Sequence, residues 1–255
     1  MIDVTEDAFL GGRVMITQPA KGYRAGIDPV FLAASVRWPR EQPTFRMLDV
    51  GAGVGTVGLC VARRCPGAHV TLLEREPELA ALARGNIERN GLAARITVVE
   101  TSIDASAAEL QALGLMAESF DDVLANPPYH AEGRGTPAPN ALKAASQAME
   151  ETGLDSWVRF MARMCKPGGC ATMIHKAEAL PAVLSAFSGR FGDLRVFPLY
   201  PREGEPASRI IVQGIKGSRA PMMLLQGVIV HADGHTFTPA AQAVLRDGEG
   251  VSLRG

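Results

Sequence analysis

Residues 45–64 read FRMLDVGAGVGTVGLCVARR, in which two apolar runs are joined by a segment rich in glycine. The first run is short and typical of a buried strand at residues 45–50, and the second has the length of a helix at residues 56–64. Pro66 ends that helix, because proline cannot continue the helical hydrogen-bond ladder. The stretch therefore predicts the first strand–turn–helix unit of a parallel sheet.

The turn between the two runs contains Gly51, Gly53 and Gly55, with Asp49 two residues before the first glycine. Glycine permits tight turns and lets the backbone approach a ligand closely at the mouth of a parallel sheet. The third glycine of the dinucleotide-binding fingerprint would fall at position 56, which is threonine in this chain. The loop alone is therefore weak evidence for a nucleotide site.

A second apolar run at residues 69–73 ends in Glu74, 23 residues beyond Gly51. An acid at the end of the second strand is placed to accept two hydrogen bonds from the ribose hydroxyls of an adenosine ligand. The alternative is a solvated glutamate in a loop. We favour the ligand-binding interpretation, because this acid strengthens the evidence of the glycine loop.

Strands and helices alternate along the rest of the chain. Pro77 and Gly91 are expected to open and close the next helix, as their preferred positions suggest. Further apolar runs predict strands at residues 95–99, 120–125, 170–174, 194–199 and 208–215, and helices capped by Asp155 and over residues 177–187. The alternation predicts an α/β fold, in which a single domain is built on a doubly wound, Rossmann-like parallel sheet of seven strands with ligands at its carboxyl edge.

The strand predicted at residues 120–125 runs into Asn126-Pro127-Pro128-Tyr129. Successive prolines cannot donate hydrogen bonds to a sheet, so we expect the strand to end there with its last carbonyls unpaired. The Asn126 side chain and the Pro127 carbonyl would offer two acceptors, and Tyr129 a flat face. This set suits a planar molecule with an exocyclic NH2 group: adenine, guanine or a primary amide.

The first 45 residues predict an irregular lead-in with one short helix, which Asp28 would cap and Pro29 would begin. Two interpretations of this segment remain. In the first, Asp28 serves only as the helix cap; in the second, the glycine-rich turn before it lies as a lid over a ligand. At the other end of the chain, residues 224–238 predict a hairpin that turns at Asp233-Gly234.

Residues 130–149 are rich in glycine, proline and alanine and carry Arg134. Such a segment is either a flexible connector or a lid that substrate orders. Its place beside the proposed pocket favours the lid.

The 255-residue chain has a formal net charge of −1 and a pI of about 6.5, so a nucleic-acid contact would need a local basic patch. No run approaches the roughly 18 apolar residues that span a bilayer, and the N-terminus has no secretory signal, so we expect a cytoplasmic protein. The spacing of the cysteines favours buried thiols over a zinc site. His231 and His235 lack a third ligand, so no metal is expected. The cysteines are Cys60, Cys65, Cys165 and Cys170.

Together, the glycine loop, Glu74 and the Asn-Pro-Pro-Tyr element resemble the class I methyltransferases that use S-adenosylmethionine and methylate exocyclic nitrogens. The closer resemblance is to bacterial adenine-N6 methyltransferases of valine tRNA, which modify the adenosine just 3′ of the anticodon. It extends over residues 9–248 and includes the segment at 18–28 and the Gly227-Val-Ile-Val-His231 tail.

The resemblance implies S-adenosylmethionine as cofactor, a cofactor-covering segment at residues 1–45 and a methyltransferase domain at residues 46–255. Glu74 would hold the ribose hydroxyls. The family commonly has an acid where this chain has Ser102, with Asp104 two residues on, so either residue would contact the adenine. The implied cofactor-binding residues are Gly26, Asp28, Asp49, Gly51, Gly53, Gly55, Glu74, Ser102, Asp104 and Asn126. The implied catalytic residues are Asn126, Pro127, Pro128 and Tyr129.

Residues 190–219 contain six basic side chains against three acids. With the basic residues of the N-terminal turn they would form a phosphate-binding rim for tRNA, or they are scattered solvated charges. The predicted substrate-binding residues are Lys21, Arg24, Arg134 and Arg209.

Other functions stay open at the level of sequence. Asn-Pro-Pro-Tyr also occurs in enzymes that methylate a glutamine amide of a protein, because a primary amide presents the same NH2 group. A small-molecule methyltransferase is a third possibility, and a cofactor-binding scaffold that activates a partner is a fourth. The sequence does not distinguish a monomer from a homodimer.

Overall fold

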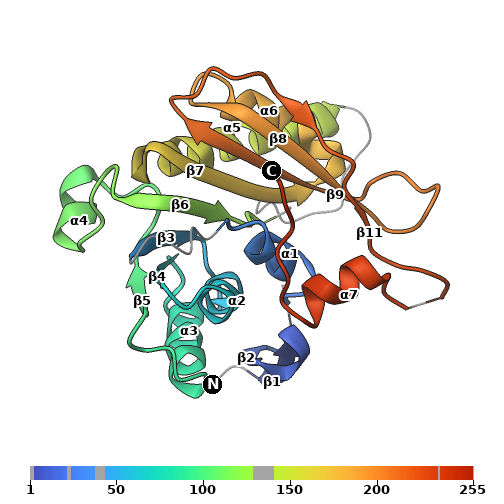
Figure 1. Ribbon diagram of the computed structural model, residues 1–255. Coiled ribbons are helices and arrows are strands. Elements are labelled where there is room, and N and C mark those ends of the chain that lie inside the picture. The colour runs from blue at the N-terminus through green and yellow to red at the C-terminus, as the bar shows by residue number, and fades with distance from the viewer. Residues whose placement is uncertain (1–2, 22–23, 38–43, 129–140, 235, 255) are drawn as a thin grey trace.

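The computed structural model describes residues 3–21, 24–37, 44–128, 141–234 and 236–254, excepting the side chains of residues 141–152. Its centre is a nine-stranded sheet in the order β10-β8-β9-β7-β6-β3-β4-β5, with β11 also paired to β8 (Figure 1). The strands are β3 (Phe45–Val50), β4 (Ala68–Glu74), β5 (Ile96–Glu100), β6 (Phe120–Ala125), β7 (Cys165–Lys176), β8 (Phe191–Tyr200), β9 (Arg209–Lys216), β10 (Met223–Leu224) and β11 (Val228–Ile229). The seven predicted strands are therefore present, and β10 and β11 are short additions beside β8.

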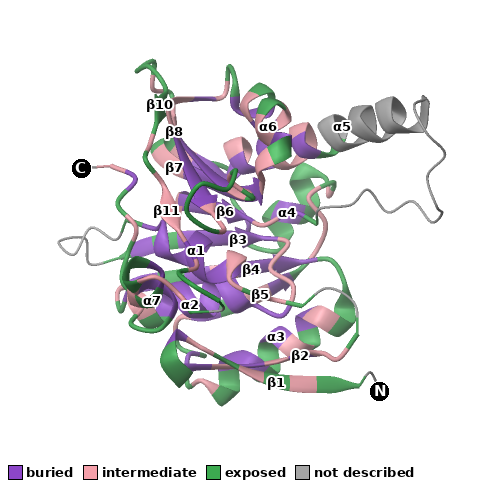
Figure 2. Ribbon diagram, turned by 90° about the vertical axis from the view of Figure 1, so that its right-hand side faces the viewer, coloured by how far each residue is buried: buried purple, intermediate pink, exposed green. Residues whose placement is uncertain are grey.

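Helices cover both faces of this sheet, so the strands between them are buried (Figure 2). One apolar cluster includes side chains of the helices α1 (Asp28–Ala34), α2 (Thr56–Arg64), α3 (Pro77–Arg89) and α7 (Pro239–Leu245). The other includes side chains of α4 (Ala107–Ala112), α5 (Ala141–Met164) and α6 (Leu180–Phe187). This confirms the doubly wound α/β fold.

The central strands owe their bounds to local sequence. β3 and β6 begin and end at the predicted residues, and α2 has the predicted bounds as well. A strand covered on both faces is apolar along its length, and glycine or proline marks its end. In β3, all residues except Arg46 are buried.

The prediction of an all-parallel sheet is wrong for β9, which runs antiparallel to both β7 and β8. Only eight residues connect β8 to β9, which is too short for the crossover that a parallel pair requires. The reversal brings Arg209, the first residue of β9, to the edge where β7 and β8 end.

The prediction of an irregular N-terminal lead-in is also wrong. The strands β1 (Val4–Phe9) and β2 (Val14–Pro19) form an antiparallel hairpin that lies beside α3 (Figure 1). Leu10, Val14 and Ile16 are fully buried in the same cluster as α2. The predicted helix follows, but Asp28 is its first residue rather than its cap, which is Ile27.

Three further predictions need correction. The helix predicted from Asp155 begins at Ala141, so residues 141–149 are helix rather than loop, and residues 130–140 lie outside the described part. The sequence did not predict α4, which the capping box of Ser106 and Glu109 begins. Among the described residues of the segment, the predicted C-terminal hairpin does not form a pair of strands: β10 and β11 each pair with β8, and a single His231–Phe237 bridge joins the two sides of the turn at Asp233-Gly234.

Candidate functional site

The sheet order brings the predicted site segments to one edge. β3 lies between β4 and β6, and Val50 pairs with Leu73 on one side and with Ala125 on the other. The residues that follow these three strands are the glycine loop (residues 51–55), Glu74 and Asn126. Because all three strands are parallel, these segments meet at the carboxyl edge, where ligands of α/β sheets bind.

Each glycine of the loop has a positive φ: +66° at Gly51, +55° at Gly53 and +87° at Gly55. A Cβ at Gly51 would lie 2.3 Å from the Trp157 ring, and one at Gly55 would lie 2.9 Å from Leu72. A Cβ at Gly53 would meet nothing within 4 Å. Two glycines therefore permit close packing against neighbouring side chains, and the third faces open space that a ligand can occupy.

Glu74 is 6% exposed and holds the loop from β4. One carboxylate oxygen accepts from the Gly53 N–H at 2.7 Å, and the other accepts from the Glu76 N–H at 2.9 Å. An ionised carboxylate can accept about four hydrogen bonds, so accepting positions remain on both oxygens. This arrangement fits a ligand with two neighbouring hydroxyls.

Asp49 lies beneath the loop rather than on it. Its side chain is 1% exposed, and Oδ2 accepts from the Gly58 N–H at 3.1 Å, in the first turn of α2. Burial, together with the nearby Glu74 charge, raises the pKa of Asp49 to about 8, against the opposing effect of the Gly58 hydrogen bond. The geometry gives Asp49 the role of orienting α2 below the loop.

Ser102 and Asp104 lie together after β5, beside Glu74, because Glu74 pairs with Glu100 and its carbonyl accepts from the Thr101 N–H. The Ser102 hydroxyl accepts from the Asp104 N–H at 3.1 Å and lies 3.3 Å from the Asp104 carboxylate. The two candidates for an adenine contact are thus members of one hydrogen-bonded turn.

The Asn-Pro-Pro element follows β6 directly. Asn126 is half-buried, Pro127 is buried and Pro128 is exposed, while Tyr129 lies outside the described residues. Since Ala125 pairs with Val50, Asn126 comes next to the start of the glycine loop at this edge. The structure therefore brings Asn126 and the loop together as the sequence predicts.

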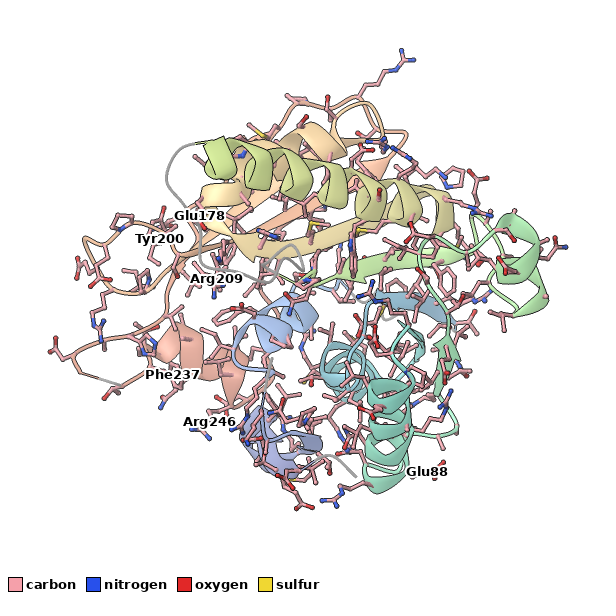
Figure 3. The ribbon with its side chains drawn as sticks, turned by 180° about the vertical axis from the view of Figure 1, so that it is seen from behind. Glu88, Glu178, Tyr200, Arg209, Phe237 and Arg246 are labelled. Atoms are coloured by element: carbon pink, nitrogen blue, oxygen red, sulfur yellow. The ribbon has the colours of Figure 1, made fainter. Side chains whose placement is uncertain are left out.

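Two predicted residues bind each other. The Arg209 Nε donates to Asp28 Oδ2 at 2.8 Å, and both side chains are largely buried. Arg209 lies with Tyr200 at the same end of the sheet (Figure 3). A pair that joins α1 to β9 fixes the start of α1 at the carboxyl edge, and it gives Arg209 a structural partner as well as its predicted role.

Of the other predicted substrate-binding residues, Arg24 forms a 2.7 Å ion pair with Asp7 of β1, and Lys21 is exposed. Arg134 lies outside the described residues. A hydrogen bond from Gln18, opposed by partial burial and supported by Arg24, lowers the pKa of Asp7. Asp7 therefore keeps the N-terminal turn attached to the hairpin.

The six basic residues of 190–219 do not form one rim. Because β8 and β9 are antiparallel, Arg190 and Lys216 lie at one end of the strand pair and Arg202 and Arg209 at the other, with Arg195 between the two ends. Five of the six basic residues pair with acids. The pairs are Arg190–Asp155, Arg195–Asp193, Arg202–Glu205, Arg209–Asp28 and Lys216–Glu118. These pairs favour the interpretation that the basic residues are scattered charges, rather than the interpretation that they form a continuous phosphate-binding surface.

Two residues at this edge escaped the sequence interpretation. Trp157 lies in the helix expected after Asp155, where its apolar character indicates only burial, yet its ring covers Gly51. Asn86, on the buried face of α3, binds the Val54 carbonyl within the glycine loop at 3.0 Å. The sequence offers one signal for Asn86: it places a polar amide on the face of the helix that is otherwise apolar.

Three of the four cysteines are buried, and burial raises the pKa of Cys60 and of Cys165 to about 12, so these thiols are not reactive. Within the described part of the chain, no group of three His, Cys, Asp or Glu side chains could hold a metal ion. No described helix is long and apolar enough to cross a membrane.

The sequence family described as the methyltransferase small domain matches residues 34–159. A tRNA1(Val) (adenine(37)-N6)-methyltransferase of Shewanella baltica is 29% identical over 159 residues, which cover 62% of this chain and 63% of that protein. The chain thus spans just under two thirds of that relative's length. A protein of the same name from Porphyromonas gingivalis is 27% identical over 203 residues, or 75% of this chain and 76% of that one.

A solved structure of a predicted O-methyltransferase from Agrobacterium tumefaciens is 31% identical and has a TM-score of 0.72. The comparison covers 88% of this chain and 98% of that one. The likeness therefore extends over most of both chains.

Proposed function

The chain belongs to the family of S-adenosylmethionine-dependent methyltransferases, and from this premise we propose that it methylates the exocyclic N6 amine of an adenine in tRNA. The observation that carries the proposal is the position of Asn126 and Pro127, directly after β6 and beside the glycine loop. An NH2 group has two N–H donors, and these residues provide two acceptors.

The described residues fit the cofactor. The open space over Gly53 and the accepting positions left on Glu74 suit a nucleoside with ribose hydroxyls. When bound, S-adenosylmethionine supplies an electrophilic methyl group. Glu74 would hold its hydroxyls, and the turn at Gly26 and Asp28 would cover it.

The chain's own residues would then act on the nitrogen. The lone pair of an aryl amine is delocalised into the ring, so attack requires the nitrogen to become more tetrahedral. The Asn126 side-chain oxygen and the Pro127 carbonyl would accept hydrogen bonds from the two N–H groups and favour that geometry, most strongly in the transition state. Tyr129 would stack on the extruded base, and alignment of the nitrogen, the methyl group and the sulfur would supply the rest of the rate enhancement. No side-chain base is needed, because the methylated cation is acidic.

The substrate assignment is supported by the names of the relatives from Shewanella baltica and Porphyromonas gingivalis. The Agrobacterium relative is named as a predicted O-methyltransferase. A hydroxyl has one donor and would use only one of the two acceptors, so the Asn126–Pro127 arrangement favours a nitrogen. A protein glutamine amide would use both and is the second candidate.

The test is methyl transfer from labelled S-adenosylmethionine to bulk tRNA, followed by mass spectrometry of the nucleosides. We expect N6-methyladenosine from the wild type, and a rate lower by about a hundredfold or more for Asn126→Ala, because a positioned transition-state hydrogen bond is lost. The variant should still bind the cofactor, which calorimetry checks. Label in protein instead of tRNA, or an unchanged single-turnover rate in the variant, would contradict the proposal.

A further inference from the structure

Asn86 connects three segments that are distant in sequence. It lies on α3, is 1% exposed and uses its whole amide group. Its Oδ1 accepts from the Thr17 N–H at 2.8 Å, and its Nδ2 donates to the carbonyls of Thr17 and Val54, each at 3.0 Å. One buried side chain therefore joins β2 of the hairpin to the glycine loop.

Asn90, one helical turn later, repeats half of this pattern. Its Oδ1 accepts from the Met15 N–H at 2.9 Å, and its Nδ2 donates to the Met15 carbonyl at 2.7 Å. The two amides thus pair with the outer edge of β2 as a neighbouring strand would. Asn90 also binds the Asn86 carbonyl of its own helix, but its hydrogen bonds do not reach the loop.

The orientation of the Val54 carbonyl depends on its hydrogen bond, because it lies between two glycines with positive φ. Glu74 holds the Gly53 N–H, the Ala52 carbonyl holds the Gly55 N–H, and Asn86 holds the carbonyl between them. Without Asn86 this peptide would lose its only described side-chain anchor and could rotate. The open face over Gly53 would then lose its fixed shape.

The other end of β2 leads to the N-terminal turn. Gln18, which is buried, accepts from the Ala25 N–H at 2.8 Å and donates to Asp7 at 2.8 Å. Ala25 immediately precedes the turn at Gly26 and Asp28. A continuous path of hydrogen bonds and backbone therefore runs from Val54 through Asn86 and β2 to that turn.

We propose that Asn86 is a positioning residue that holds the glycine loop and the N-terminal turn in one register, so that cofactor binding orders both. The inference rests on the proposed function, in which the loop lies under the cofactor and the turn covers it. Asn86 does not touch the reacting atoms; it acts through Val54 and Thr17.

Calorimetric titration with S-adenosylhomocysteine tests the effect on binding. Asn86→Ala should raise the Kd about tenfold, because the Val54 carbonyl loses its partner. Asn90→Ala is the matched control: it removes two hydrogen bonds to the same strand, and its Kd should stay within about twofold of the wild type. An unchanged Kd for Asn86→Ala, or an equal rise for Asn90→Ala, would overturn the inference.

Hydrogen exchange supplies a readout that a merely structural role would not change. In the wild type, S-adenosylhomocysteine should slow exchange both at residues 51–55 and at residues 14–19. In Asn86→Ala the protection should persist at the loop and disappear at β2, whereas Asn90→Ala should keep both. Protection of β2 that survives in Asn86→Ala would contradict the coupling.

Asn86→Asp serves if Asn86→Ala does not fold, because aspartate keeps the acceptor for the Thr17 N–H and removes the donor to the Val54 and Thr17 carbonyls. It should raise the Kd in the same way, and an unchanged value would overturn the inference. Failure of the wild type to bind S-adenosylhomocysteine would instead contradict the proposed function. Normal binding by the wild type and by all variants would contradict only the role of Asn86.

Discussion

Glu74 shows how one side chain can both shape a site and serve it. Its carboxylate fixes the Gly53 N–H, so the loop is ordered before any ligand arrives. The accepting positions that remain on its oxygens suit the two neighbouring hydroxyls of a ribose. Asp49 is only two residues before the loop, but its carboxylate instead accepts a hydrogen bond from the Gly58 N–H of α2. Burial and partners, rather than residue type, separate the roles of these two acids.

Glu74→Ala should weaken cofactor binding about ten- to a hundredfold, since hydrogen bonds to a charged group contribute roughly 1.5–3 kcal/mol. Calorimetry with S-adenosylhomocysteine measures this. Glu76→Ala is the control, because Glu76 pairs with Arg75 at the surface. A Glu74→Ala variant that binds as tightly as the wild type would remove Glu74 from the site.

At the scale of elements, the glycine loop is a joint between β3, α2 and α5. Gly51 and Gly53 both have positive φ, but Trp157 of α5 covers only Gly51. The two positions therefore have different costs for a side chain. Position 51 is limited by its contact with the Trp157 ring, and position 53 by the open space that a ligand would occupy.

Gly51→Ala should lower the free energy of unfolding by about 2–4 kcal/mol, from backbone strain and overlap with Trp157. Gly53→Ala should lower it by only about 1–2 kcal/mol, from strain alone, but should weaken cofactor binding more, because its methyl enters the open space. Urea denaturation and calorimetry on both variants give the comparison. Equal stability losses in the two variants would show that Trp157 does not limit position 51.

At the scale of the whole molecule, two buried acids oppose folding at neutral and alkaline pH. Asp49 and Asp122 are 1% and 2% exposed and lie on the neighbouring strands β3 and β6. Burial raises the pKa of each from 3.8 to about 8. The folded chain keeps protons that the unfolded chain releases, so this contribution favours folding below about pH 4 and is lost as the pH rises towards 8.

Asp122→Asn should raise the free energy of unfolding at pH 8, by up to about 5 kcal/mol for a pKa difference of four units. Its Oδ1 has no hydrogen-bond partner among the described residues, and asparagine keeps an oxygen that can accept from the Val123 N–H as the carboxylate does. The variant should also flatten the decline in stability between pH 5 and 8, measured by urea denaturation. Asp247→Asn, at an exposed position, is the control and should change neither.

The chain termini also belong to the whole-molecule scale. Arg13 donates to the Arg246 carbonyl, Arg64 to the Gly248 carbonyl, and the Val251 N–H to the Ala34 carbonyl. The N-terminal hairpin and the C-terminal tail thus close over the same face of the sheet as α1 and α2. The predicted division at residue 45 cuts through this shared core.

The sequence by itself determined the strand–helix alternation, the bounds of β3, α2 and β6, and the gathering of the glycine loop, Glu74 and Asn126 at one edge. Apolar periodicity and the positions of glycine and proline are local properties, and the carboxyl ends of parallel strands must meet. Only the tertiary structure decided the packing of the hairpin beside α3, the Asp28–Arg209 pair and the bonds of Asn86. Those partners are separated by 181 residues for Arg209 and Asp28 and by 69 for Asn86 and Thr17, so no local pattern records them. They form because folding buries polar groups, and a buried polar group needs a hydrogen-bond partner.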